Sequence, residues 1–323
     1  MTLRLGLIYG GNSPEHDISF RSFQSIQEMM NREKYLLIPI KIEREGHFDI
    51  NLLHEIDLAF PILHGPNGED GTIQGMLKLL NIPIVGPPHS FCTIAMDKDL
   101  TKRLLSFSHL PTANWITLKS RSDYAFEEVV EKLSLPFFVK PAHMGSSLGV
   151  SKVYSKAAFE EALKKAFEID SKVIIEEEIK GREIECGILG SKNPKASCLG
   201  EIILPKDSYY SYELKYVSSE RVQFAIPAKI DSSLTEAIRS AALKAYDVLG
   251  GAGMARIDFL VKESGEFYIN EVNPIPGFTS ISLYPKMWKE SGLGFQSLLE
   301  ELISSSQIRK NREGRTQHVA ELL

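Results

Sequence analysis

The stretch MARIDFLVKESGEFYINEVNPIPG places two carboxylates where a β-hairpin would bring them together. Apolar and polar residues alternate on both sides of a short polar turn, which predicts two antiparallel strands. Pairing Lys262 with Phe267 sets a register in which Asp258 lies opposite Glu271. The same register puts two further polar side chains on that face, Arg256 and Asn273.

This pairing of carboxylates predicts a magnesium site. Two carboxylates about 5 Å apart repel by roughly 3 kcal/mol at a dielectric typical of a protein surface, and a bound cation removes that repulsion. Carboxylate and amide oxygens are hard ligands that suit Mg²⁺, which usually also binds substrate phosphates. The expected ligands are Asp258, Glu271 and Asn273. A slipped register or a solvent-exposed face is the alternative interpretation.

A second stretch, PFFVKPAHMGSSLGVSKV, places small residues between two apolar strands. Small residues let backbone N–H groups approach phosphate oxygens, and Lys140 adds a positive charge. A phosphate-binding loop and an ordinary hairpin turn both fit this pattern. The segment Gly145–Gly149 also matches the G-x-S-x-G pattern of serine hydrolases, with Ser147 as the nucleophile. That motif needs a helix after the loop, whereas a strand is expected here, so the pattern disfavours a hydrolase.

Other polar residues stand in loops or at strand ends. Glu15 and His64 lie in glycine-rich loops after predicted strands, where an open parallel sheet binds its ligands. Each of them alone fits a helix cap or a surface group equally well. The acidic run Glu176–Glu178 by itself indicates a solvated face. The aromatic segment 209–216 predicts either a lid over a site or a separate packed cluster.

Strand and helix patterns that alternate along the chain would position these residues. A buried strand at 3–9 precedes a glycine-rich loop and a helical pattern at 15–30. This alternation predicts a parallel sheet with ligands at the carboxyl ends of its strands. Further strands are expected at 35–42, 56–63, 114–116, 137–140, 149–154, 173–178, 183–189 and 200–204, and helices at 73–80, 97–107, 155–167, 234–249 and 294–304.

Composition excludes several classes of protein. A chain of 323 residues with 43% hydrophobic and 24% charged residues is not intrinsically disordered. Its 42 acidic and 37 basic residues give a net charge of −5, which argues against binding nucleic acid. The three cysteines are widely spaced without a CxxC pair, which fits a reducing cytosol and argues against structural zinc. Because no apolar run approaches the roughly 20 residues that span a bilayer, we expect a cytoplasmic protein without membrane contacts.

Six stretches, in order and spacing, resemble the D-alanine–D-alanine ligase family of the ATP-grasp superfamily, over residues 3–304. The resemblance implies an α/β fold of three domains, with ATP between the last two. We expect an N-terminal parallel-sheet α/β domain at 1–90, a central α+β domain at 91–180, and a C-terminal α+β domain with a mixed or antiparallel sheet at 181–323, its tail mobile from about 307. The stretches are GGNSPEHDIS, HGPNGEDGTIQG, KPAHMGSSLGVSKV, SYYSYELKY, ARIDF and EVNPIPGFTSISL.

The resemblance implies ATP and Mg²⁺ as cofactors. It implies two metal ions at Asp258, Glu271 and Asn273, where Mn²⁺ can replace Mg²⁺. Lys98 and Lys140 would contact the phosphates of ATP, beneath a loop that includes Gly145, Ser146 and Ser147. Glu176, Glu178 and Ile179 would surround adenine, and Glu183 would contact the ribose. Lys215 would contact the transferred phosphoryl group. The resemblance places Glu15 at the ammonium of the first D-alanine, with His64 nearby, and Ser282 and Tyr210 at the carboxylate of the second. Arg256 and the Gly277 N–H would contact the oxyanion. Tyr216, Ser146 and Glu15 would form a hydrogen-bonded network that closes the lid.

The implied reaction joins two D-alanine molecules through a D-alanyl phosphate, for peptidoglycan precursor synthesis. The implied assembly is a homodimer. One alternative is another ATP-grasp carboxylate–amine ligase that joins different amino or hydroxy acids. A second is a nucleotide-binding regulator whose ligase activity has decayed, which the retained Arg256, Asp258, Glu271 and Asn273 disfavour.

Overall fold

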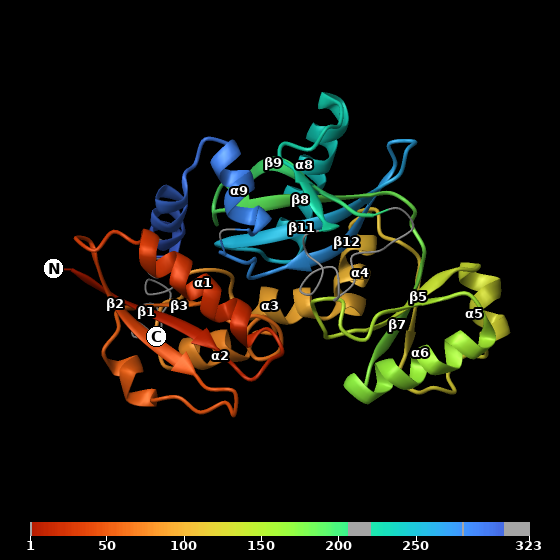
Figure 1. Ribbon diagram of the computed structural model, residues 1–323, viewed down its shortest axis with the longest axis horizontal. Helices are drawn as coiled ribbons and strands as arrows, with labels where there is room; N and C mark the ends of the chain where they lie inside the picture. Colours follow the sequence, from red (N-terminus) through yellow and green to blue (C-terminus); the bar gives the residue numbers. More distant parts are fainter. Residues whose placement is uncertain (1, 206–220, 280, 307–323) are drawn as a thin grey trace, which may run out of the picture.

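Three β-sheets follow one another along an elongated molecule (Figure 1). The structure is a computed structural model that describes residues 2–205, 221–279 and 281–306. A parallel sheet lies at one end, a four-stranded antiparallel sheet lies at the other, and a five-stranded antiparallel sheet lies between them (Figure 1). Two short helices, α3 (His89–Met96) and α4 (Lys98–Phe107), run along the underside of the five-stranded sheet.

The predicted parallel sheet is confirmed, with the strand order β2-β1-β3. Its central strand is apolar and buried from residue 5 onward, so the sheet needs cover on both faces. Helix α1 packs on one face, and α2 packs with the core of the other. The loops that follow β1 and β3 meet, and Ser13 Oγ donates to the carbonyl of His64 at 2.6 Å. The elements are β1 (Leu3–Gly10), α1 (His16–Met29), β2 (Tyr35–Ile42), the 3₁₀ turn η1 (Ile50–His54), β3 (Leu58–Pro61) and α2 (Thr72–Leu79).

The four-stranded sheet has the order β4-β7-β5-β6 and carries two helices on its outer face (Figure 1). Those helices are amphipathic, and their apolar sides bury Val129, Phe159 and Leu163 against the sheet. The opposite face of this sheet is turned toward the five-stranded sheet. The elements are β4 (Trp115–Leu118), α5 (Phe126–Leu133), β5 (Phe137–Pro141), β6 (Ser151–Val153), α6 (Lys156–Ile169) and β7 (Val173–Glu177).

The five-stranded sheet has the order β10-β9-β8-β11-β12 and holds a large apolar core. On one face it packs against α3, α4 and α8, where Phe91 and Tyr246 stack edge to face. On the other face it packs against α9, and the helical segment 295–306 continues that core toward the parallel sheet. The elements are β8 (Arg182–Leu189), β9 (Lys195–Ile203), β10 (Gln223–Ala225), α8 (Ser232–Val248), β11 (Met254–Val261), β12 (Phe267–Asn273) and α9 (Leu283–Glu290).

Most predicted elements are present, but α3, α5, α9 and β10 were not predicted. Each is short, and α3 is so apolar that it lacks the polar stripe by which a surface helix is recognised. The division of the chain at residues 90 and 180 stays a prediction. Across the described part of the chain, no helix combines the length and apolar character that crossing a bilayer requires.

Candidate active site

The hairpin of β11 and β12 brings the predicted metal ligands onto one face. Asp258 lies opposite Glu271, as the alternation of residues predicts. Arg256 lies opposite Asn273 in the same ladder. The two pairs stand two residues apart on each strand, and residues with that spacing share a face of the sheet. The structure therefore places all four polar side chains together.

The turn end of this hairpin departs from the predicted register by one residue. Phe267 pairs with Val261 and not with Lys262, so the prediction was wrong there. A register shift between Asp258 and Phe259 adds one residue to β12 and restores the predicted pairing beyond it. A β-bulge of this kind re-aims side chains and is frequent beside active sites.

Arg256 is held among the carboxylates of this sheet. Its Nε and Nη2 each lie 2.8 Å from an oxygen of Asp258, and Nε lies 3.1 Å from Glu185 Oε2. Burial alone would lower the pKa of Arg256, but Asp258 and Glu185 raise this pKa well above its usual value. Asn273 also donates from Nδ2 to Asp258 Oδ2 at 2.9 Å. A guanidinium fixed in this way is suited to stabilise negative charge that develops on a substrate.

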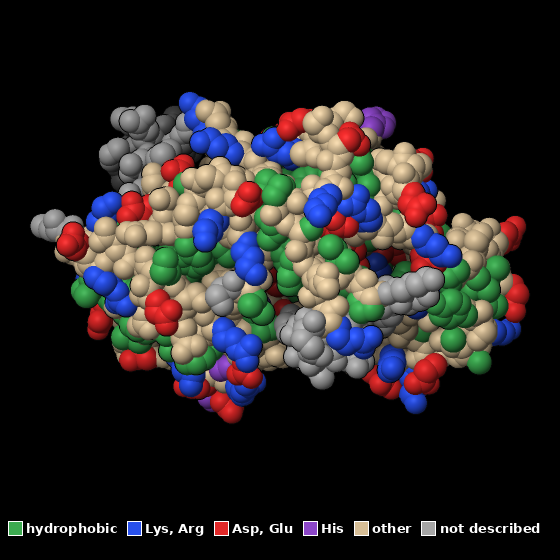
Figure 2. Space-filling model, turned by 45° about the horizontal axis from the view of Figure 1, so that its top comes forward, with side chains coloured by type: hydrophobic (Ala, Val, Ile, Leu, Met, Phe, Trp, Pro, Cys, Tyr) green, Lys and Arg blue, Asp and Glu red, His purple; other side chains and the backbone are tan. Residues whose placement is uncertain are grey.

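A cavity of about 1200 Å³ separates the four-stranded sheet from the five-stranded sheet. One wall comes from β5, β6 and β7, and the other comes from β8, β11 and β12. Figure 2 shows a recess on the right of the view in which acidic and basic side chains are mixed. The predicted site residues that line the cavity are Lys98, Lys140, Ser147, Glu176, Glu178, Ile179, Glu183, Arg256, Asp258 and Glu271.

Glu176 lies buried between two lysines on the floor of this cavity. Lys102 contacts one of its carboxylate oxygens and Lys140 contacts the other. Burial alone would raise the pKa of Glu176, but the two lysines hold this pKa below its ordinary value. The acidic run alone indicated a solvated face, which is wrong for Glu176 because this side chain points into the space between the sheets. Lys102 was not predicted, although it follows Lys98 by four residues on α4 and so shares its helix face.

Lys98 connects the loop after β5 with the hairpin of β11 and β12. Its Nζ lies 2.6 Å from the carbonyl oxygen of Met144 and 3.1 Å from Glu271 Oε1. Its backbone N–H donates to the carbonyl of Ala142 at 3.1 Å. On the opposite rim, Lys152 Nζ lies 2.5 Å from Glu178 Oε1. Positive charge is therefore present at both the loop end and the adenine end of the predicted nucleotide site.

The glycine–serine loop joins β5 directly to β6. Ser146 and Ser147 adopt left-handed backbone angles, with φ of 52° and 58°, which few residues other than glycine and asparagine accept. Because β6 follows the loop, the strand–turn–helix geometry of a hydrolase nucleophile is not formed at Ser147. Ser146 Oγ donates to Glu15 Oε1 across the gap to the parallel sheet. A Cβ built on Gly145 would lie 3.7 Å from Glu15 Oε2, so the start of this loop also faces Glu15.

The loops at the carboxyl edge of the parallel sheet position Glu15 and His64. Glu15 precedes α1, and its backbone N–H donates to Ser13 Oγ at 3.1 Å. His64 is buried, and its Nε2 lies 3.3 Å from Ser22 Oγ on α1. Burial lowers the pKa of His64, against the attraction of Glu15, so this imidazole is neutral at physiological pH. Both loops follow strands of one parallel sheet, as the strand pattern predicts.

Glu69 belongs to the same region and was not predicted. Its Oε2 accepts the backbone N–H of Gly65 at 2.8 Å, and the side chain is buried. Burial and the nearby Glu15 carboxylate raise the pKa of Glu69 to about 8. A buried ionisable group with such a shift beside other polar residues is a candidate functional residue. The sequence shows only an acidic residue in a glycine-rich turn, where it resembles an ordinary turn former.

Gly277 and Ser282 lie together after β12, where α9 begins. Ser282 is the N-cap residue of α9, and its Oγ lies 2.7 Å from Thr279 Oγ1. A Cβ on Gly277 would lie 2.7 Å from Ser282 Oγ, so a larger residue there would displace this hydroxyl. The backbone N–H of Phe278 donates to Ser22 Oγ at 3.3 Å, which also contacts His64. These contacts connect the start of α9 with the carboxyl edge of the parallel sheet.

Three predicted residues, Tyr210, Lys215 and Tyr216, lie outside the described residues. The remaining predicted residues form two neighbouring groups. One group lines the cavity between the antiparallel sheets, and the other lies where the parallel sheet, the glycine–serine loop and the start of α9 meet. Arg256 links the groups, because it lines the cavity and its charge also acts on His64.

Comparison with protein families gives two matches that together span most of the chain. Residues 104–304 match the family described as D-ala D-ala ligase C-terminus. Residues 4–52 and 48–87 match the family described as D-ala D-ala ligase N-terminus. A curated relative, the D-alanine–D-alanine ligase of Proteus mirabilis, is 41% identical over 345 aligned positions, which cover 93% of this chain and 94% of the relative.

Solved structures of similar proteins share the arrangement of the three sheets. The D-alanine–D-alanine ligase of Coxiella burnetii has a TM-score of 0.88 and 31% identity, covering 99% of this chain and 98% of that protein. The D-alanine–D-alanine ligase of Bacillus anthracis complexed with ATP has a TM-score of 0.83 and 33% identity, covering 97% of this chain and all of that protein, 100%.

Proposed function

Since the chain belongs to the D-alanine–D-alanine ligase family, we propose a role for each described residue of its site. The chain is an ATP-dependent ligase that joins D-alanine to D-alanine. One observation carries the proposed roles: Lys98 and Lys140 meet Asp258 and Glu271 at a single cavity. Fixed cations beside a carboxylate pair suit the transfer of a phosphoryl group from ATP, because that reaction depends on positioning and on neutralising charge.

The reaction needs activation because a carboxylate is a poor electrophile. A carboxylate oxygen of the first D-alanine attacks the γ-phosphorus of ATP, and ADP leaves, which gives an acyl phosphate. The neutral amine of the second D-alanine then attacks the acyl carbon. The C–N bond forms, phosphate leaves, and one proton is lost from the amine. Every species between substrates and products is anionic, so positive charge is required throughout.

Lys98 and Lys140 would supply that charge at the phosphates. Lys98 already binds the carbonyl of Met144 at the start of the glycine–serine loop, so its ammonium is fixed where this loop covers the cavity. Ser146 and Ser147 would present backbone N–H groups to phosphate oxygens, which their left-handed angles favour. The proposed adenine contacts are Glu176, Glu178 and Ile179, with Glu183 at the ribose, and all four line the cavity.

The hairpin fits Mg²⁺ through the chemistry of its donors. Asp258, Glu271 and Asn273 offer carboxylate and amide oxygens, and Mg²⁺ commonly takes one or two carboxylates together with waters and substrate phosphates. A bound ion would neutralise charge on the transferred phosphoryl group.

The substrates would lie between Glu15 and α9. Glu15 would hold the ammonium of the first D-alanine, near the buried His64. Ser282 and the first N–H groups of α9 would bind the carboxylate of the second D-alanine, because a helix N-terminus attracts an anion. Arg256 and the N–H of Gly277 would stabilise the oxyanion as the amine attacks. The roles of Tyr210, Lys215 and Tyr216 stay predictions.

Further proposals concern assembly, location and organisation. Similarity to the ligase family supports a homodimer, a cytoplasmic location, and a division of the chain near residues 90 and 180 into three domains. Sedimentation velocity over a range of protein concentrations tests the dimer. A mass that stays that of one chain at every concentration would rule it out.

The decisive assay measures phosphate release with ATP, Mg²⁺ and D-alanine, with L-alanine, D-serine and D-lactate as alternative substrates. We expect release to require D-alanine and the metal ion. Release that needs a different acid would favour the other carboxylate–amine ligase, and ATP binding without any release would favour a decayed regulator.

Two variants extend the assay: Glu271→Gln removes a proposed metal ligand, and Glu266→Gln changes an exposed carboxylate of the same hairpin. Only the first should raise the Mg²⁺ concentration required for half-maximal rate.

A further inference from the structure

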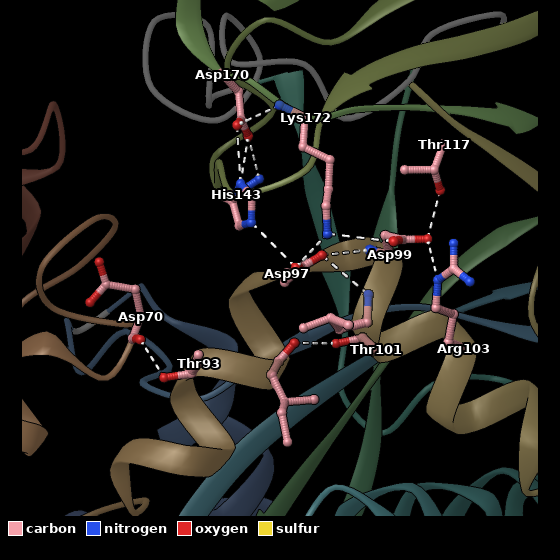
Figure 3. Close-up of polar contacts among 12 residues, drawn as sticks. Asp70, Thr93, Asp97, Asp99, Thr101, Arg103, Thr117, His143, Asp170 and Lys172 are labelled. Carbon is pink, nitrogen blue, oxygen red and sulfur yellow. Dashed lines mark hydrogen bonds and ion pairs between the residues drawn. The ribbon is translucent and has the colours of Figure 1, made fainter. Parts of the chain in front are cut away.

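A cluster of charged side chains lies at the base of the glycine–serine loop, outside the cavity lining (Figure 3). We call it the loop-base cluster and define it as Asp97, His143, Asp170 and Lys172. These residues come from three parts of the chain: the start of α4, the loop just after β5, and the connection from α6 to β7. The proposed reaction does not use any of them, so their arrangement calls for its own explanation.

His143 is held by carboxylates on both sides of its ring. Nδ1 lies 3.0 Å from both oxygens of Asp170, and Nε2 lies 3.3 Å from Asp97 Oδ2 (Figure 3). The backbone N–H of His143 also donates to Asp170 Oδ2 at 2.7 Å. Both carboxylates are almost fully buried, with side-chain exposures of 8% for Asp97 and 7% for Asp170. A ring with an acceptor at each nitrogen is satisfied only when both nitrogens carry protons, which is the charged form.

The charges that face this cluster balance when His143 is protonated. Asp97 accepts from Lys172 Nζ at 2.6 Å, and the same ammonium lies 3.4 Å from Asp99 Oδ2. Arg103 Nε donates to Asp99 Oδ1 at 3.0 Å. Three carboxylates on α4 and after α6 therefore face three cations, of which His143 is one. The hydrogen bonds to Asp170 and Asp97 raise the pKa of His143 to about 9, so the balance holds at physiological pH.

The cluster fixes the loop because His143 stands between two residues that bind Lys98. Ala142 accepts the backbone N–H of Lys98 at 3.1 Å, and Met144 accepts its Nζ at 2.6 Å. Lys98 directly follows Asp97, whose side chain caps α4 by accepting the N–H groups of Asp99 and Leu100 at 3.1 Å. One carboxylate thus sets both the direction of α4 and the position of the His143 ring.

We propose that His143 is a positioning residue, whose ring fixes the base of the loop Gly145–Gly149 relative to Lys98 so that both meet the phosphates of ATP together. The inference rests on the proposed function, in which this loop and Lys98 bind those phosphates. Among the described residues, Met144 lines the cavity and His143 does not, so the histidine acts through its neighbours. Disorder of the loop base would weaken binding of ATP more than binding of D-alanine.

Two substitutions of His143 separate charge from size. His143→Gln removes the positive charge, and we expect the KM for ATP to rise about tenfold, the effect of losing one charge-assisted hydrogen bond. The KM for D-alanine should rise less than the KM for ATP, because the loop reaches the D-alanine site only through the contact of Ser146 with Glu15. His143→Arg keeps a charged planar donor that can face two carboxylates, so this variant should retain the ATP affinity of the parent. His47→Gln, in an exposed turn of the parallel sheet region, is the matched control.

A pH series provides a readout that a merely structural role would not move. The parent should lose ATP affinity as pH rises through about 9, where His143 loses its proton. His143→Arg should lack this step because its charge persists. An unchanged KM for ATP in His143→Gln, or the same step in His143→Arg, would overturn the proposal. If the glutamine variant does not fold, the arginine variant and the parent still decide the question.

One further variant separates failure of this inference from failure of the proposed function. Lys98→Met removes the ammonium that is proposed to bind phosphates. If Lys98→Met raises the KM for ATP and His143→Gln does not, the role of His143 is wrong and the proposed function stands. If neither variant changes the KM for ATP, the assignment of this region to the phosphates is wrong.

Discussion

Single residues in this site owe their chemistry to burial as much as to their type. Glu176 stays ionised in a buried position because two lysines face it, whereas Glu69 is buried beside another carboxylate and favours its neutral form. The same side chain therefore behaves in opposite ways at two ends of one active site. The difference follows from the charges that the fold places nearby.

Glu69 gives a prediction for stability as a function of pH. Its pKa of about 8 in the folded state lies above the ordinary value of 4.5, so its contribution to stability is complete below the lower value and disappears as pH rises through about 8. Glu69→Gln stays neutral and can still accept the N–H of Gly65. Relative to this variant, the parent should lose about 2 kcal/mol of unfolding free energy between about pH 6 and pH 9.

Thermal or urea unfolding at several pH values checks this expectation. Glu45→Gln, which changes an exposed acid in the turn after β2, is the control and should keep the pH profile of the parent. A Glu69→Gln profile that runs parallel to the parent across this range would show that Glu69 titrates normally.

At the scale of elements, α9 is held close to the sheet by glycine. A Cβ on Gly187 of β8 would lie 3.1 Å from Trp288 Nε1 and from ring atoms of Tyr284. These rings are buried, and Tyr284 also donates to the carbonyl of Ile188 at 2.9 Å, so they have little room to move. The position of α9 fixes Ser282 at its start, and hence the proposed site for the second carboxylate.

Gly187→Ala should therefore affect both stability and the second substrate. We expect a loss of about 1–3 kcal/mol in unfolding free energy, the usual cost of overpacking a core. The KM for the second D-alanine should rise, while the KM for ATP stays near that of the parent. Gly75→Ala on α2 is the control, because a Cβ there meets nothing within 4 Å and should stabilise the helix by up to about 1 kcal/mol. Equal effects of Gly187→Ala on both substrates would contradict the role of α9.

The elements also show which features of the fold and site can be predicted from the sequence. Alternation alone predicts that Asp258 faces Glu271, because each strand of the hairpin has one buried and one polar face. The bulge in β12 was missed although the sequence marks it, because Asn270 and Glu271 are consecutive polar residues that interrupt the alternation between the buried Ile269 and Val272. Lys102 and Glu69 were missed for another reason: their importance depends on burial, which arises when distant elements pack. The resemblance to the ligase family as a whole implies the roles assigned to site residues, and the structure supplies the distances between the described ones.

At the scale of the whole molecule, each group of site residues lies between sheets. The cavity proposed to bind the nucleotide separates the two antiparallel sheets, and the contact between Ser146 and Glu15 joins the glycine–serine loop to the parallel sheet. A ligand bound in the cavity therefore connects parts of the chain that have separate apolar cores. Binding of ATP should for this reason stabilise the molecule as a whole, and not the loop alone.

A thermal shift assay with a non-hydrolysable ATP analogue and Mg²⁺ tests this connection. At about 100 times the dissociation constant, binding contributes about 2.7 kcal/mol, which corresponds to a rise in Tm of roughly 5 °C for a chain of this size. Lys140→Met should lose most of that rise, whereas Lys156→Met, at an exposed lysine on α6, should keep it.

Ser146→Ala should keep the shift in Tm with the ATP analogue but lose the additional shift with D-alanine, because the variant breaks the contact with Glu15. A full D-alanine shift in Ser146→Ala would mean that the parallel sheet and the loop bind substrate independently.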